Sequence, residues 1–164
     1  MLLDPKFWNA LGITALMVVV SVPISIIVAL LITVVLNSIK PLRGFFQTIF
    51  FLPYVTNGVA FGLVFATIFS PQPYGLVNTM LSWFNIDPVA WTGEAAYVPL
   101  WAGIFVITVY SVWNGLAFKI LVFLSGIQGI DKQYYQAAQI DGASKFRVFR
   151  KVTLPLLSPM VLYI

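Results

Sequence analysis

Long runs of apolar residues, separated by short polar stretches, dominate the pattern of this chain. The runs 11–36, 45–69 and 98–121 are each long enough to cross about 30 Å of hydrocarbon, which takes roughly 20 helical residues. A fourth apolar run begins at residue 152 and continues to residue 164. The pattern predicts an all-α membrane protein, with three complete transmembrane helices and a truncated fourth in one incomplete domain over residues 1–164. We expect the sequence to be a fragment of a longer protein or a truncated gene product.

Composition supports this prediction and excludes several kinds of chemistry. Hydrophobic residues make up 60% of the chain and charged residues only 9%, whereas soluble domains carry about 25% charged residues. Cysteine and histidine are both absent. This excludes disulfides, metal sites built on thiolate or imidazole, and every catalytic arrangement of a nucleophile with histidine. We therefore expect no metal site.

The distribution of basic residues predicts the orientation. The formal charge of +4 comes from loops that flank apolar runs, which membrane orientation explains better than nucleic-acid binding. Basic residues lie between the first two spans and along residues 130–151, whereas residues 70–97 contain no Lys or Arg. By the positive-inside rule, residues 130–151 form a cytoplasmic loop and residues 70–97 an outer loop. Within the outer loop, residues 74–84 have the spacing of a short helix at the membrane surface.

The cytoplasmic loop reads as two short helices joined by a glycine turn. Asp131 is suited to cap the start of the first helix, because its carboxylate can accept free backbone N–H groups. Gly142 stands where that helix should end, in the left-handed conformation that glycine tolerates. Ser144 can then cap a second helix that carries the basic residues on one side. The pattern predicts a compact, basic helical hairpin.

Two interpretations of this hairpin are open. A basic amphipathic hairpin can lie on anionic lipid headgroups. The small, uncharged pair Ala137 and Ala138 favours a docking surface instead, because small residues let another backbone approach closely.

The spacing of this loop carries a family resemblance. An Ala-Ala pair, three residues, a glycine, nine residues and then Val-x-Leu-Pro resemble the EAA loop of ABC importer permease subunits. Gly75-Leu76-Val77-Asn78 in the outer loop and Leu52-Pro53 in the second span also resemble the carbohydrate-uptake branch, of the maltose, lactose and glycerol-phosphate type. The resemblance assigns coupling to an ATPase to Gln136, Ala137, Ala138, Asp141, Gly142, Ala143, Phe149, Leu154 and Pro155. The family has Glu where this chain has Gln136, so a hydrogen bond is retained there but an ion pair is not.

The resemblance implies a fold, a function and a set of partners. The fold is the transmembrane domain of a type I ABC importer. The function is solute translocation in a binding-protein-dependent importer in a bacterial or archaeal plasma membrane, for a sugar, oligosaccharide or polyol. The implied partners are an ABC ATPase dimer, a second permease subunit and an extracytoplasmic solute-binding protein. The chain has no phosphate-binding glycine loop, so ATP would be bound by the ATPase; the permease itself needs no cofactor and is not an enzyme.

Polar groups within the spans are candidates for contact with solute. Sugars are bound by amides, hydroxyls and flat aromatic faces, which Asn57, Tyr110, Trp113 and Asn114 can supply. The same side chains also form interhelical hydrogen bonds or lie at lipid interfaces, so both interpretations are open.

Two other functions were weighed against the importer. A secondary, ion-coupled transporter requires ionisable groups or broken helices near the bilayer midplane, and the three complete spans contain no acidic residue. An intramembrane enzyme lacks histidine, cysteine or paired carboxylates in these spans. The sequence does not identify the solute.

Overall fold

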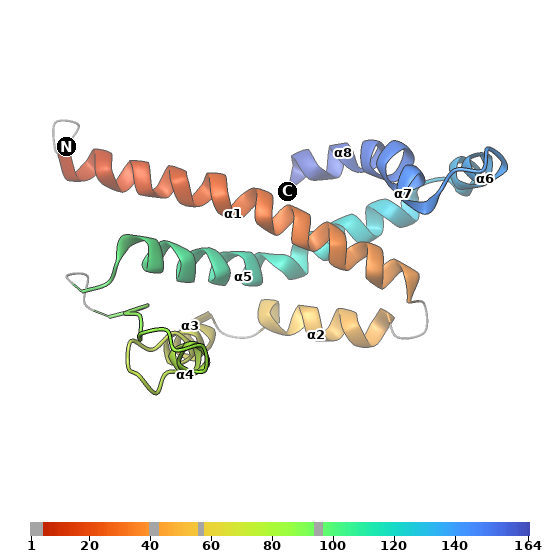
Figure 1. Cartoon of the computed structure of the whole chain (residues 1–164). Coiled ribbons are helices and arrows are strands. Elements are labelled where there is room, and N and C mark those ends of the chain that lie inside the picture. Colours follow the sequence, from red (N-terminus) through yellow and green to blue (C-terminus); the bar gives the residue numbers. More distant parts are fainter. Residues whose placement is uncertain (1–4, 40–42, 56–57, 94–96) are drawn as a thin grey trace. The chain divides into compact units, whose positions relative to one another are not determined.

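The regular secondary structure of the described residues is entirely helical. The computed structural model describes residues 5–39, 43–55, 58–93 and 97–164, and Figure 1 shows that the regular elements in these ranges are all helices. The predicted all-α class is therefore confirmed for these residues. In chain order the elements are α1 (Pro5–Ser38), α2 (Arg43–Val55), α3 (Gly58–Ile68), α4 (Leu76–Ser82), α5 (Leu100–Gly129), α6 (Lys132–Ile140), α7 (Lys145–Val148), the π-helical turn η1 (Phe149–Thr153) and α8 (Leu154–Tyr163).

Within the described residues, α1 and α5 are the two helices long and apolar enough to cross a membrane. The predicted spans 11–36 and 98–121 fall on these helices, and α5 continues to Gly129, past the predicted end of its span. The predicted span 45–69 falls on α2 and α3, on either side of residues 56 and 57, which lie outside the described residues. The limits of the spans and their orientation stay predictions.

The chain forms two compact units, each with its own packing. The first comprises Met1–Ser25 and Phe51–Gly115, and the second comprises Ile26–Phe50 and Leu116–Ile164. Both α1 and α5 contribute one part to each unit.

The core of the first unit joins α3, the segment that follows α4, and the first half of α5. Its buried residues are Phe69, Trp91, Ala102 and Val106. The rings of Phe69 and Trp91 meet edge to face, with their centroids 5.9 Å apart, an arrangement that aromatic pairs favour. This core holds Trp91, from the segment that follows α4, against the first half of α5.

In the second unit, the last part of α5 packs against α8. Phe123 and Leu157 are each fully buried. Gly126 allows the helices to approach closely, because a Cβ atom placed there would lie 2.7 Å from Leu157 Cδ2 and 3.2 Å from Met160 Cγ. A small residue at a close helix contact is typical of packing within membranes.

Candidate functional site

The predicted hairpin is formed by α6, the turn of residues 141–144, and α7, and we call it the basic hairpin. Asp131 caps α6, since its Oδ1 accepts a hydrogen bond from the backbone N–H of Gln133 at 2.9 Å. Ser144 caps α7 in the same manner, accepting from the N–H of Arg147 at 3.4 Å. Both predicted caps are confirmed. Each satisfies a backbone donor that the first turn of a helix leaves free.

Gly142 ends α6 in the predicted left-handed conformation, with φ +65°. The N–H of Gly142 donates to the carbonyl of Gln139, and the N–H of Ala143 donates to the carbonyl of Ala138, each at 3.0 Å. This pair of bonds is the Schellman motif, which satisfies carbonyls that the helix end leaves free. The bonds are all local, so the turn is encoded by the residues that form it.

A π-helical turn joins the basic hairpin to α8. The N–H of Leu154 donates to the carbonyl of Phe149, five residues earlier, and Pro155 follows within the first turn of α8. Proline has no N–H to donate, and its ring clashes with the carbonyl four residues earlier in a regular helix. The wider π turn accommodates this proline. The sequence pattern placed Pro155 in the predicted coupling set but did not predict the π turn.

Most predicted coupling residues lie at the surface. Ala138, Ala143 and Phe149 are partly buried, whereas the remaining members of the set are exposed: Gln136, Ala137, Asp141, Gly142, Leu154 and Pro155. The structure thus brings the Ala-Ala pair and the glycine turn together on one short hairpin.

The hairpin also exposes large apolar side chains. Ile140 is 86% exposed and Phe146 is 72% exposed. The basic residues Lys145, Arg147 and Arg150 are exposed as well. Exposed apolar and cationic groups together suit either a protein partner or anionic lipid headgroups, so both interpretations of the hairpin stay open.

The predicted solute residues of α5 share one face of that helix, because they are three and four positions apart. Tyr110 is partly buried and packs edge to face on Phe65, with ring centroids 5.2 Å apart. Trp113 and Asn114 are exposed. Asn57, the fourth candidate, lies outside the described residues. Contact with a solute therefore stays a prediction for all four.

Asn78 of α4 is the centre of a polar cluster to which sequence reasoning gave no physical role. Its side chain is 1% exposed. Its Oδ1 accepts from the N–H of Val89 at 3.1 Å and from Nε1 of Trp91 at 2.8 Å. Its Nδ2 lies within 3.1–3.3 Å of the carbonyls of Ser70, Gln72 and Val89. One amide therefore ties both flanks of α4 together, which a buried polar group requires.

Gly75 allows the chain to turn tightly before α4. A Cβ atom placed there would lie 2.7 Å from the carbonyl oxygen of Ser70, which is too close for any other residue without a backbone shift. The Gly-Leu-Val-Asn segment thus contains both the turn and the amide that holds it. The Gly-Leu-Val-Asn segment is therefore the sequence signal for this turn.

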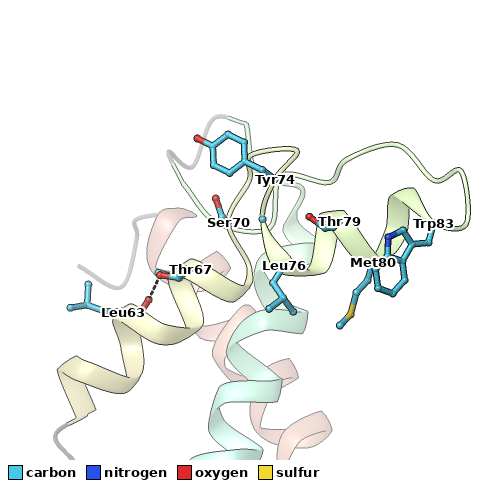
Figure 2. Close-up of a pocket in the computed structure, with 10 residues that line it drawn as sticks. Leu63, Thr67, Ser70, Tyr74, Leu76, Thr79, Met80 and Trp83 are labelled. Carbon is cyan, nitrogen blue, oxygen red and sulfur yellow. Dashed lines mark hydrogen bonds between the residues drawn. The ribbon is translucent and has the colours of Figure 1, made fainter.

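A groove of about 800 Å³ lies between α3 and α4. Figure 2 shows Leu63 and Thr67 on α3, Leu76 and Met80 on α4, and Trp83 directly after α4 around it. The hydroxyl of Thr67 donates to the carbonyl of Leu63 at 2.9 Å, within its own helix. Since this hydroxyl is already bonded and most of the other lining side chains are apolar, the groove is mainly apolar.

Comparison with known proteins places this chain in a family of transport components. The family described as "Binding-protein-dependent transport system inner membrane component" matches residues 21–163. The arabinooligosaccharides transport system permease protein AraP of Halalkalibacterium halodurans is 34% identical over 99% of this chain and 50% of its own length. The lactose transport system permease protein LacF of Rhizobium radiobacter is 37% identical over 98% of this chain and 52% of its own length. The chain spans about half the length of these curated relatives.

Solved structures agree with this placement. One is a bacterial ABC transporter involved in the import of the acidic polysaccharide alginate, with a TM-score of 0.72 and 29% identity over 94% of this chain and 51% of that chain. A second is the bacterial alginate ABC transporter in complex with an alginate pentasaccharide-bound periplasmic protein, with a TM-score of 0.75 and 28% identity over 98% of this chain and 54% of that chain. The predicted transmembrane-domain fold of an ABC importer is therefore confirmed. With the match over residues 21–163, these likenesses show that the chain belongs to the family of binding-protein-dependent transport system inner membrane components.

Proposed function

We propose that this chain forms membrane-spanning structure in an ATP-driven importer, and that it carries solute across the membrane without catalysing a reaction. The ATP would be hydrolysed by a separate ATPase dimer that contacts the basic hairpin. A second permease subunit and an extracytoplasmic solute-binding protein would complete the transporter, in the plasma membrane of a bacterium or archaeon.

The observation that carries this proposal is the structure of the basic hairpin. Its turn is fixed internally by the caps at Asp131 and Ser144 and by the Schellman bonds at Gly142. Its surface nevertheless exposes Ile140 and Phe146. A rigid hairpin with exposed apolar side chains presents the same shape to a partner before and after binding, so little conformational entropy is lost on docking.

The solute class is proposed from the relatives. AraP and LacF are named for arabinooligosaccharides and lactose. MalF of Thermococcus litoralis, 33% identical over 96% of this chain, is named for trehalose and maltose. These solutes differ in size and linkage but are all carbohydrates. We therefore propose a sugar or oligosaccharide as the solute, with Asn57, Tyr110, Trp113 and Asn114 as candidate contacts.

The docking role is tested by blocking the hairpin surface. Ala137→Trp places a large side chain at an exposed, small position of α6, so it should abolish copurification of the ATPase subunit with the tagged full-length protein. Gln128→Trp is the matched control, since Gln128 is also exposed but precedes the hairpin; this variant should retain the ATPase. Equal retention of the ATPase by both variants would refute the docking role.

Uptake of radiolabelled lactose, maltose and arabinooligosaccharides by the intact transporter then tests the solute class.

A further inference from the structure

Two hydroxyl groups meet where the basic hairpin joins α8. Tyr135 Oη of α6 lies 3.3 Å from Thr153 Oγ1 of η1, across 18 positions of sequence. Thr153 is only 6% exposed, and Tyr135 is partly buried. The contact therefore links α6 directly to the turn that starts α8.

This link differs from the other bonds of the hairpin. The caps at Asp131 and Ser144 and the Schellman bonds each join residues no more than five positions apart. They fix the shape of the hairpin but do not attach it to the membrane helices. The Tyr135–Thr153 contact connects α6 to η1, which belongs to the same unit but lies outside the basic hairpin.

A hollow lies beside this contact. It measures about 320 Å³ and lies within the second unit. Tyr135 and Thr153 both line it, together with Asn37 at the end of α1 and Ile127 near the end of α5. A helix next to such a hollow can shift with little steric resistance, so a specific link has more effect on its position.

Thr153, by contrast, belongs to a tightly packed part of the second unit. The π turn that contains it leads directly into α8. The fully buried Leu157 and the close contact at Gly126 hold α8 against α5. A displacement passed to Thr153 would therefore be passed to α8 and, through the contact at Gly126, to the long helix α5.

We propose that Tyr135 and Thr153 are positioning residues that make α6 move together with α8. A displacement of α6 by the ATPase then reaches α8 through this contact as well as along the chain. The proposal rests on the proposed function, because it assumes that the ATPase acts on α6.

The expected effect of removing the contact is modest and measurable. A distance of 3.3 Å is long for a hydrogen bond between two hydroxyls, so its net contribution lies near the lower end of the usual range. Its loss should raise the population with α6 detached from η1 about threefold.

The test measures the distance between α6 and α8 in the transporter assembled with its ATPase and reconstituted in lipid nanodiscs. The chain contains no cysteine, so Gln133→Cys on α6 and Ser158→Cys on α8 would be its only spin-labelling sites; both positions are exposed. Pulsed electron paramagnetic resonance then gives the distribution of distances between the labels, with and without a non-hydrolysable ATP analogue.

In the parent protein we expect one dominant narrow distribution and a small second population under both conditions. Tyr135→Phe and Thr153→Val should each raise that second population about threefold when the nucleotide analogue is bound. The double variant should behave as either single variant does, because both remove the same contact. Thr153→Ser keeps the hydroxyl and should restore the narrow distribution.

Tyr163→Phe is the matched control. It removes a tyrosine hydroxyl from an exposed position of the same unit, outside the hairpin, and should leave the distribution unchanged. An unchanged distribution in Tyr135→Phe, additive effects in the double variant, or equal broadening in Tyr163→Phe would each overturn the proposal. If no ATPase copurifies with the parent protein, the proposed function fails, whereas the nucleotide-free distributions still test the contact itself.

Discussion

The segment around Asn78 and the basic hairpin hold their short helices in place with different kinds of hydrogen bonds. Both must hold short helices in place outside the long apolar helices. The segment of residues 70–92 does so with one buried amide, whose bonds reach from Ser70 to Trp91. The hairpin does so with caps and turn bonds between near neighbours, and it leaves Ile140 and Phe146 exposed.

The difference shows what each region is suited to do. Removing the Asn78 side chain would break the hydrogen bonds to the segments on both sides of α4. The stability of this region is therefore concentrated in one residue. The hairpin distributes its stability over several weak local bonds. It therefore keeps its shape while its side chains remain available to a partner. The following substitutions test this contrast, from the largest expected effect to the smallest.

Asn78→Leu should be the most damaging change. Leucine has the same number of side-chain heavy atoms and the same branching but offers no hydrogen bonds, so the N–H of Val89 and Nε1 of Trp91 lose their acceptor in a buried site. We expect the free energy of unfolding to fall by about 3 kcal/mol or more. Thermal unfolding in detergent, followed by circular dichroism, measures this loss.

Gln72→Leu is the control for that substitution. The side chain of Gln72 is exposed, and only its backbone carbonyl contacts Asn78. Its stability should stay within about 0.5 kcal/mol of the parent protein. Similar losses in the two variants would show that the amide of Asn78 is not the centre of this segment.

Gly142→Ala should weaken the hairpin without unfolding the protein. A Cβ atom at Gly142 meets nothing within 4 Å, so the expected penalty comes from the left-handed backbone alone. That conformation costs a non-glycine residue about 1–2 kcal/mol. If binding requires this turn, the affinity for the ATPase subunit should fall about tenfold.

Gly129→Ala provides a matched comparison at the end of α5. A Cβ atom there also meets nothing within 4 Å, but the backbone is not left-handed. Binding of the ATPase, measured on full-length protein in nanodiscs, should be unchanged by this variant. Equal affinities for the two alanine variants would remove the turn from the docking surface.

Gln136→Glu should have the smallest effect and tests the departure from the family pattern. The side chain is exposed, where an ion pair contributes at most about 1 kcal/mol. We expect the affinity for the ATPase to stay the same or to rise by up to about fivefold, with the gain disappearing at high salt. Gln128→Glu, outside the hairpin, should give no gain. A clear loss of affinity in Gln136→Glu would mean that this chain makes a different contact at that position.

The hairpin could be predicted from sequence because its determinants are local. Asp131, Gly142 and Ser144 each act within five positions of themselves, so their spacing was sufficient to place both caps and the turn. The apolar runs were likewise sufficient to predict the helical class and the positions of α1 and α5, because an apolar run of that length has few alternatives to a helix.

The tertiary structure alone decided which distant residues meet. Asn78 reads in the sequence as a polar residue of a predicted short helix and of a family motif, and its structural role depends on Trp91, 13 positions away. Thr153 reads as part of an apolar run, and its contact with Tyr135 exists only because the glycine turn folds α6 back toward η1. The physical reason is that hydrogen bonds and packing depend on proximity in space. A sequence encodes that proximity directly only where the partners are also neighbours along the chain.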